Sequence, residues 1–146
     1  MSKMSVKKGE ILKIYTDGAA RGNPGPAAIA FIFLYESKII HKGVDYIGYT
    51  TNNEAEYQAI INALKASKRF SRGYIQIFSD SNLVIQQINK KWKINKPHLS
   101  KLCSEVYQLS QSYEKVEFFQ VGRNNSYIQK CDSLCNKRLD EEGFKK

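Results

Sequence analysis

The order of its apolar patterns predicts that the chain folds as an α/β protein, with a five-stranded mixed sheet flanked by helices on both faces. Three observations predict this class. Five short stretches alternate apolar with polar residues or are rich in Ile, Val, Phe and Tyr, as strands are. Other stretches repeat apolar residues at the three- and four-residue spacing of a helix. The first three strand-like stretches are consecutive, whereas helices precede and separate the last two.

The first part of the chain is predicted to form three strands. Residues 11–15 alternate, and Thr16-Asp17-Gly18 predicts a turn at the end of this strand. Residues 21–26 contain glycine, asparagine and proline, which is typical of a loop. Residues 27–35 are rich in Ile and Phe and predict a second strand, with residues 38–46 as its hairpin partner.

Helical periodicity begins after these strands. The polar run 50–53 supplies capping side chains directly before Glu54, where we expect a helix to start. A strand over 74–78 ends close to Asp80 and leads into a short helix. The remaining predicted elements are a proline-containing connector over 90–97, a helix over 99–113, a strand over 116–121 and a final helix that includes Ile128 to Leu139.

The composition indicates a globular protein that is attracted to polyanions. The chain has 146 residues, which suits one domain over 1–146, and we expect residues 1–10 to be a flexible tail. Lys and Arg outnumber Asp and Glu by 23 to 14, a net charge of +9, so nucleic acid is the leading class of partner. No apolar run resembles a signal peptide or membrane span. We therefore expect a cytoplasmic protein without membrane attachment, and a monomer.

The cysteines and histidines have plain interpretations. Cys131 and Cys135 lie one helical turn apart without the second pair that a zinc site needs, so we expect the three cysteines to be reduced thiols that fill the core. His41 and His98 are expected to be surface or hairpin residues.

Four carboxylates lie at positions where folding does not require acids. Asp17 and Asp80 follow predicted strands, Glu56 lies in the first turn of a helix, and Asp132 lies in the last helix. Each alone has a simple interpretation, such as solvation or helix capping. Because the carboxyl ends of parallel strands gather at one edge of a sheet, Asp17 and Asp80 should be neighbours. Clustered acids repel one another, which favours Mg²⁺, or Mn²⁺ as a substitute, as the neutralising cation.

Four short motifs follow one another along the chain. The segment 15–26, Tyr-Thr-Asp-Gly-Ala-Ala-Arg-Gly-Asn-Pro-Gly-Pro, is similar to the opening motif of a known family, the type 1 ribonucleases H. Residues 51–57, 79–81 and 131–136 resemble its second, third and fourth motifs in the same order. Four ordered motifs make chance similarity improbable. The resemblance covers residues 15 to 136 and implies a ribonuclease H-like fold.

The resemblance also implies a chemistry. It identifies Asp17, Glu56, Asp80 and Asp132 as the catalytic and metal-binding residues, with Asp17 bridging two Mg²⁺ ions. The spacing in the family selects Glu56 rather than Glu54. The implied activity is endonucleolytic hydrolysis of the RNA strand of RNA/DNA hybrids, which leaves 5′-phosphate and 3′-hydroxyl ends. Activity on double-stranded RNA is left open.

Two groups of residues are candidates for binding the hybrid. Reading RNA against DNA requires contacts to the 2′-hydroxyl, for which exposed backbone and amide side chains are suited. By resemblance, Thr51 grips a DNA phosphate, and the residues that line the minor groove are Gly22, Asn23, Asn52 and Asn53. Turn chemistry and helix capping are the alternative interpretation of these residues.

The second group is the basic connector before Pro97. Lys91, Trp92 and Lys93 could hold the DNA backbone by charge and contact a sugar or base, or could form an ordinary solvated connector. The connector is shorter than the basic protrusion of some family members, so the chain resembles a compact form. The loop before Asp132 lacks the histidine or glutamate that many family members carry.

Two other functions remain open from the sequence. The missing loop histidine and the short basic connector also suit a module that binds hybrids with weak or no catalysis. A DNA nuclease or recombinase of the same broad fold would share the acidic metal site. The paired asparagines and the Gly22-Asn23 loop argue against this third function.

Overall fold

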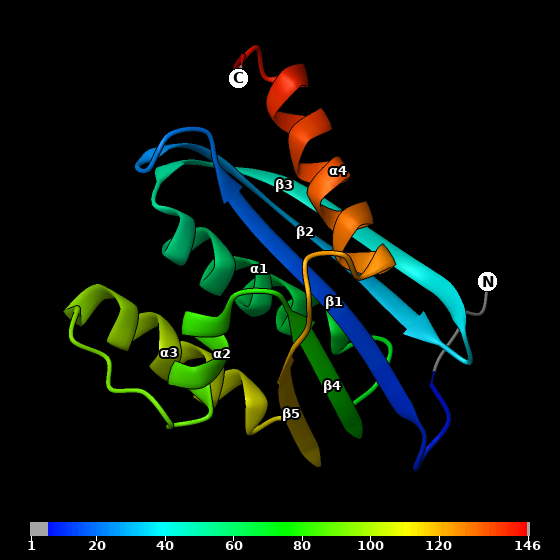
Figure 1. Cartoon of the computed structure of the whole chain (residues 1–146). Helices are drawn as coiled ribbons and strands as arrows, with labels where there is room; N and C mark the ends of the chain where they lie inside the picture. Colours follow the sequence, from blue (N-terminus) through cyan, green and yellow to red (C-terminus); the bar gives the residue numbers. More distant parts are fainter. Residues whose placement is uncertain (1–5, 146) are drawn as a thin grey trace.

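The computed structural model describes residues 6–145 and contains one five-stranded sheet with the strand order β3-β2-β1-β4-β5 (Figure 1). The α/β class predicted from the sequence is confirmed. The elements in chain order are β1 (Ile11–Ala20), β2 (Gly25–Tyr35), β3 (Lys38–Thr50), α1 (Asn52–Ser67), β4 (Tyr74–Ser79), α2 (Asn82–Ile88), α3 (Pro97–Ser110), β5 (Lys115–Gln120) and α4 (Ser126–Glu141).

The sheet is mixed, as the element order predicts. β2 pairs antiparallel with both β1 and β3, whereas β4 runs parallel to β1 and β5. The parallel strands β1, β4 and β5 therefore point their carboxyl ends to the same edge of the sheet, where ligand sites form in open sheets.

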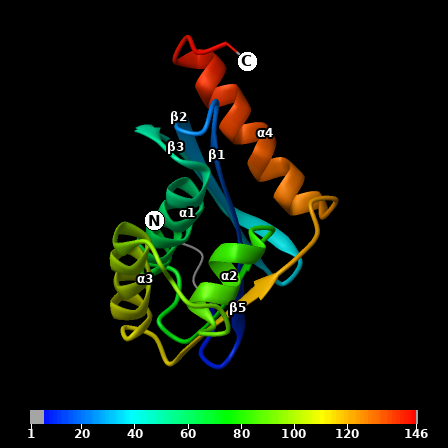
Figure 2. The same ribbon diagram turned by 60° about the vertical axis from the view of Figure 1, so that its left-hand side comes forward.

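Helices cover both faces of the sheet (Figure 2). The two faces differ because successive side chains of a strand point in opposite directions. Phe31 and Phe33 of β2 join the core under α1, α2 and α3, whereas Ile32 and Leu34 join the core under α4. β2 is buried on both faces because it lies between two layers of helix.

One expectation about β1 is wrong. Thr16-Asp17-Gly18 does not form a turn that ends the strand, because antiparallel pairing with β2 continues through Ala20, opposite Ala27. Pairing with β4 is shorter and ends where Tyr15 meets Phe78. Asp17 therefore lies inside β1 but beyond its parallel pairing, where β1 and β4 have separated and leave space at the edge of the sheet.

The remaining sequence expectations concern residues away from this edge. The three cysteines are buried and free, as expected. In the N-terminal segment, Met1–Ser5 lie outside the described residues, whereas the Val6 N–H donates a 2.9 Å hydrogen bond to the Phe70 carbonyl. Among residues 6–145, no helix combines the length and the apolar character needed to cross a membrane.

Candidate active site

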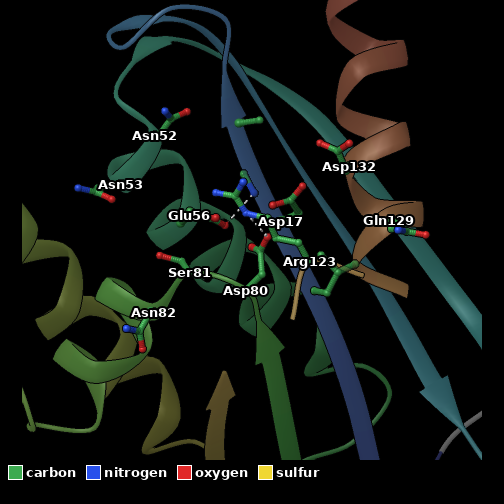
Figure 3. Close-up of a pocket in the computed structure, with 13 residues that line it drawn as sticks. Asp17, Asn52, Asn53, Glu56, Asp80, Ser81, Asn82, Arg123, Gln129 and Asp132 are labelled. Atoms are coloured by element: carbon green, nitrogen blue, oxygen red, sulfur yellow. Dashed lines mark hydrogen bonds and ion pairs between the residues drawn. The ribbon is translucent and has the colours of Figure 1, made fainter. Parts of the chain in front are cut away.

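A cavity of about 680 Å³ opens at the carboxyl ends of β1 and β4, between the first turns of α1 and α2 and the first half of α4 (Figure 3). All four carboxylates named from the sequence line it, so segments that are far apart in the chain do converge. The residues that line the cavity are Asp17, Gly18, Ala19, Asn52, Asn53, Glu56, Asp80, Ser81, Asn82, Arg123, Ile128, Gln129 and Asp132.

Three of the carboxylates form a tight cluster. Asp17, Glu56 and Asp80 each offer an oxygen atom, and these atoms lie within 4.8 Å of one another. Asp17 is only 6% exposed. Oxygen ligands at this spacing match the ligand set of a hard divalent cation such as Mg²⁺ or Mn²⁺.

Glu56 reaches the cluster because α1 packs closely against β1 at Gly18. The Gly18 N–H donates a 2.9 Å hydrogen bond to Glu56 Oε1. A Cβ atom on residue 18 would lie 2.3 Å from the Ala55 carbonyl carbon and 2.7 Å from the Glu56 nitrogen. Only glycine allows this contact, so the smallest residue of the first motif sets the position of the second carboxylate.

Replacing Gly18 by alanine should therefore displace the first turn of α1. We expect Gly18→Ala to lower the free energy of unfolding by about 1–3 kcal/mol, the usual effect of overpacking, and to reduce nuclease activity per folded molecule at least tenfold. Urea unfolding and single-turnover cleavage measure the two effects. Gly43→Ala is the matched control, because its Cβ would lie 2.3 Å from the Phe31 ring, outside the cavity. Equal activity of the two variants would contradict this account.

Asp132 contributes from the opposite side of the cavity. It is exposed on α4 and is not a member of the three-carboxylate cluster. Figure 3 shows its side chain on the side of α4 that faces Asp17. Its negative charge contributes to raising the pKa values of both Asp17 and Asp80. The fourth acid is thus electrostatically part of the site without contacting the other three.

The cluster has perturbed proton affinities. Burial, followed by the charges of Asp80 and Asp132, raises the pKa of Asp17 to about 8. Burial and the charges of Asp17 and Asp80 raise the pKa of Glu56 well above its ordinary value. Burial also raises the pKa of Asp80, and the nearby Arg123 opposes this rise. Without a cation, the folded protein must hold protons here or accept repulsion between buried charges.

The raised pKa of Asp17 predicts a pH-dependent stability of the metal-free protein. Between pH 4, near the ordinary aspartate pKa, and pH 8, the folded state binds more protons than the unfolded state, so stability falls as pH rises. Asp17→Asn removes one of these groups. We expect the variant to unfold like the unmutated protein near pH 4 and to become the more stable of the two as pH rises to 8, by at most about 1.4 kcal/mol for each pH unit. Urea unfolding in a metal chelator measures this, and a parallel loss of stability with pH in both proteins would contradict it.

The amide residues predicted to bind the hybrid join the β1–β2 loop to the start of α1. Thr51 is the N-cap of α1 and its side chain accepts from the Glu54 N–H at 3.2 Å. Asn52 Oδ1 accepts from the Ala20 N–H at 2.9 Å, and the Asn52 N–H donates to Asn23 Oδ1 at 3.1 Å. The capping and turn roles considered from the sequence are therefore present. Asn52 and Asn53 also line the cavity.

Arg21 connects the same loop to the helix that carries Asp132. Its Nη2 donates to the Asn136 carbonyl at 3.1 Å, and its Nη1 pairs with Asp140 at 2.8 Å and donates to the Phe144 carbonyl. The Arg21 side chain is only 9% exposed. A buried guanidinium with several acceptors fixes the segments that it joins.

Loss of this guanidinium should loosen α4. We expect Arg21→Met to lower the free energy of unfolding by about 1–3 kcal/mol, since it removes the hydrogen bonds that the little-exposed guanidinium donates to the part-buried carbonyls of Asn136 and Phe144. Arg138→Met serves as the control, because the partners of Arg138 are the half-exposed or exposed Asp45 and Glu142, and exposed pairs contribute about 0–1 kcal/mol. Thermal or urea unfolding compares the two. A smaller loss of stability in Arg21→Met than in Arg138→Met would contradict the role of Arg21 in holding α4 to the β1–β2 loop.

The basic connector lies outside the cavity. Lys91, Trp92 and Lys93 are exposed between α2 and α3, and Trp92 keeps 48% of its surface exposed. They are not among the residues that line the cavity. Their side chains are exposed to solvent, so a ligand that extends beyond the cavity can contact them.

The structure adds four cavity residues with polar side chains that the sequence interpretation did not select. They are Ser81, Asn82, Arg123 and Gln129. Arg123 lies in the loop before α4, which lacks the histidine that many family members carry. Its Nε is 3.9 Å from Asp80 Oδ2, and its side chain is 94% exposed. Its position after a predicted strand and before the helix of Asp132 was a signal for the same sheet edge. Ser81 is the N-cap of α2, because its side chain accepts a hydrogen bond from the Val84 N–H.

Comparison with known proteins agrees with this geometry. The family model for RNase H matches residues 9–138. Ribonuclease HI of Halobacterium salinarum is 36% identical over 135 residues, which cover 92% of this chain and 67% of that protein. The crystal structure of RNase H1 from the same archaeon has a TM-score of 0.84 at 34% identity, covering 90% of this chain and 98% of that chain.

Of two further relatives, one is much longer than this chain and the other was solved with a bound nucleic acid. The bifunctional protein Rv2228c of Mycobacterium tuberculosis is 32% identical over 130 residues, and the match spans 87% of this chain but only 35% of that protein. LC11-RNase H1, solved in complex with an RNA/DNA hybrid, has a TM-score of 0.84 at 31% identity and is matched over 98% of its length, which is 90% of this chain.

Proposed function

The chain belongs to the RNase H family of nucleases, and we propose that it hydrolyses the RNA strand of RNA/DNA hybrids with Mg²⁺, or Mn²⁺ as a substitute, held by Asp17, Glu56, Asp80 and Asp132. The observation that carries the proposal is the cluster of three carboxylate oxygens within 4.8 Å of one another at the floor of an open cavity. A hybrid-bound relative of the same fold supports the substrate.

The donor set suits divalent cations. All the candidate ligands are carboxylates, and no cysteine or histidine among the described residues lines the cavity, which favours Mg²⁺ or Mn²⁺ over zinc. When bound, a pair of such ions supplies a nucleophilic water and stabilises the leaving oxygen in phosphodiester hydrolysis. We expect the products to carry 5′-phosphate and 3′-hydroxyl ends.

The surroundings of the acids support Glu56, and not Glu54, as the ligand. Glu54 accepts a hydrogen bond from the Thr50 hydroxyl, and its Oε1 lies 3.4 Å from His98 Nε2. These contacts hold Glu54 between the end of β3 and the start of α3. Glu56 instead lines the cavity and accepts from Gly18.

The remaining residues are assigned to positioning. The Gly18 N–H holds the Glu56 carboxylate and Asp17 is buried within β1, so their oxygens need little rearrangement on binding a cation. Arg123 reduces the negative charge beside Asp80, and its exposed guanidinium can reach a phosphate of the substrate. Asn52 and Asn53, at the mouth of the cavity, can contact the 2′-hydroxyl that distinguishes RNA from DNA. Asn23 accepts from the Asn52 N–H and so supports this edge, while Gly22 stays a candidate for the minor groove and Thr51 a candidate for a DNA phosphate.

Cleavage of a labelled RNA/DNA hybrid tests the proposal. We expect cutting of the RNA strand with Mg²⁺ or Mn²⁺, none in a chelator, and a loss of at least about 1,000-fold in Asp17→Asn, which removes a charged ligand that the reaction needs. Duplex DNA should stay intact. The matched control is Glu54→Gln, an acid two residues from Glu56 that lies outside the cavity, and it should retain activity.

The outcomes separate the proposed enzyme from its alternatives. Binding of hybrid without metal-dependent cutting would overturn the nuclease proposal and support a binding module. Equal cutting of duplex DNA would support a DNA nuclease. Double-stranded RNA, included as a third substrate, decides the tolerance that the sequence left open. The cytoplasmic location, the monomeric state and the single-domain organisation stay predictions.

A further inference from the structure

A second groove lies on the far side of α4 from the carboxylates. It has a volume of about 420 Å³ and runs between α4, from Ser126 to Lys137, and Lys42 of β3. We call it the α4 groove, and the polar side chains that line it are Lys42, Ser126, Gln129, Lys130, Ser133 and Lys137. It thus presents three lysines and no acid to solvent.

The lysines of the α4 groove have no acidic partners. Lys42, Lys130 and Lys137 are exposed, and none of them forms an ion pair with a carboxylate in the described part of the chain. The acid of β3 closest to Lys42 in sequence, Asp45, is instead 3.8 Å from Arg138. Three unpaired cations in one groove make a local site of positive potential.

The α4 groove adjoins the catalytic cavity through Gln129, which lines both. Figure 3 shows Gln129 on the side of α4 that faces away from the carboxylates, whereas Asp132 faces them. Lys42 lies opposite Ile32 of β2, which in turn lies opposite Tyr15 of β1, two residues before Asp17. Two strand spacings place Lys42 roughly 10 Å across the sheet from β1.

The spacing of the lysines suits an extended anionic backbone. Lys130 and Lys137 are seven residues apart on α4, which is roughly 10 Å along the helix axis. A nucleic acid duplex carries a charge about every 1.7 Å of its length, so two or three of its phosphates can meet these ammonium groups at once. A small anion would satisfy only one of them.

We propose that the α4 groove binds the phosphate backbone of the nucleic acid beyond the scissile site. This inference rests on the proposed hybrid substrate. The duplex would then cross the cavity from the basic connector at Lys91 and Lys93, on the α2–α3 side, to the lysines beside α4. Positive charge on both sides of the acidic cavity anchors a polyanion that the carboxylates themselves would repel.

Salt-dependent binding of a hybrid of about 20 base pairs tests this surface, since each lost phosphate contact lowers the slope of log Kd against log salt by about 0.9. Binding is measured in the Asp17→Asn background, where no hydrolysis interferes. We expect Lys130→Gln/Lys137→Gln to lower the slope by roughly 2 and to weaken binding at least tenfold at low salt. Lys130→Arg/Lys137→Arg should restore both, because it keeps the charges.

The matched control is Lys7→Gln/Lys8→Gln, which removes the same charge from two exposed lysines before β1 that line a different pocket, beside Ser71 and Glu114. A groove variant whose slope equals that of this control overturns the proposal and leaves an acidic protein as the occupant of the groove. Combination with Lys91→Gln/Lys93→Gln should lower the slope by the sum of the two effects, and a combined effect no larger than either alone also overturns it.

The test is independent of catalysis. When Asp17 is retained, we expect Lys130→Gln/Lys137→Gln to have a KM for hybrid cleavage at least fivefold higher than that of the unmutated protein. Its kcat should be unchanged. If the unmutated protein binds hybrids but cuts none, the nuclease proposal fails while the slope still decides the role of the α4 groove.

Discussion

The main chain of Gly18 and the first turn of α1 meet so closely that no side chain fits between them. Through this contact the Gly18 N–H holds the Glu56 carboxylate beside Asp17, and Asp80 completes the cluster from the end of β4. The helices on both faces of the sheet are tied to the end of β1 by side-chain hydrogen bonds. Arg21 ties α4 to the β1–β2 loop, and Asn52 ties that loop to α1. Every acid of the site therefore depends on how tightly helices pack around the end of β1.

The close packing of these acids lowers the stability of the folded protein when they are ionised. Burial, and after it the charges of neighbouring acids, raises the pKa values of Asp17, Glu56 and Asp80, so the site opposes folding at the pH at which a hydrolytic enzyme must keep its acids ionised. A divalent cation removes this conflict because it favours the ionised forms. The large apolar cores on both faces of the sheet supply the stability that tolerates such a site.

Charge is distributed in opposite senses within the site and around it. The cavity gathers four acids in a chain whose net charge is +9, while unpaired lysines lie on the α2–α3 connector and beside α4. A polyanionic substrate is therefore attracted by the flanks and reaches the acids only where a cation neutralises them. The lysines proposed to hold the nucleic acid backbone therefore lie outside the cavity in which the chemistry is proposed, whereas Asn52 and Asn53 line it.

The sequence alone determined the α/β class, the order of the elements and the four acids, because apolar periodicity and short motifs are local properties of the chain. Thr51 as helix cap follows in the same way. Other features required the tertiary structure. The extension of β1 past Asp17 depends on pairing with β2, and the α4 groove joins Lys42 to Lys130 and Lys137 across some ninety residues. These contacts form between segments distant in sequence, so no local pattern records them, and only the packing of α4 on the sheet brings them together.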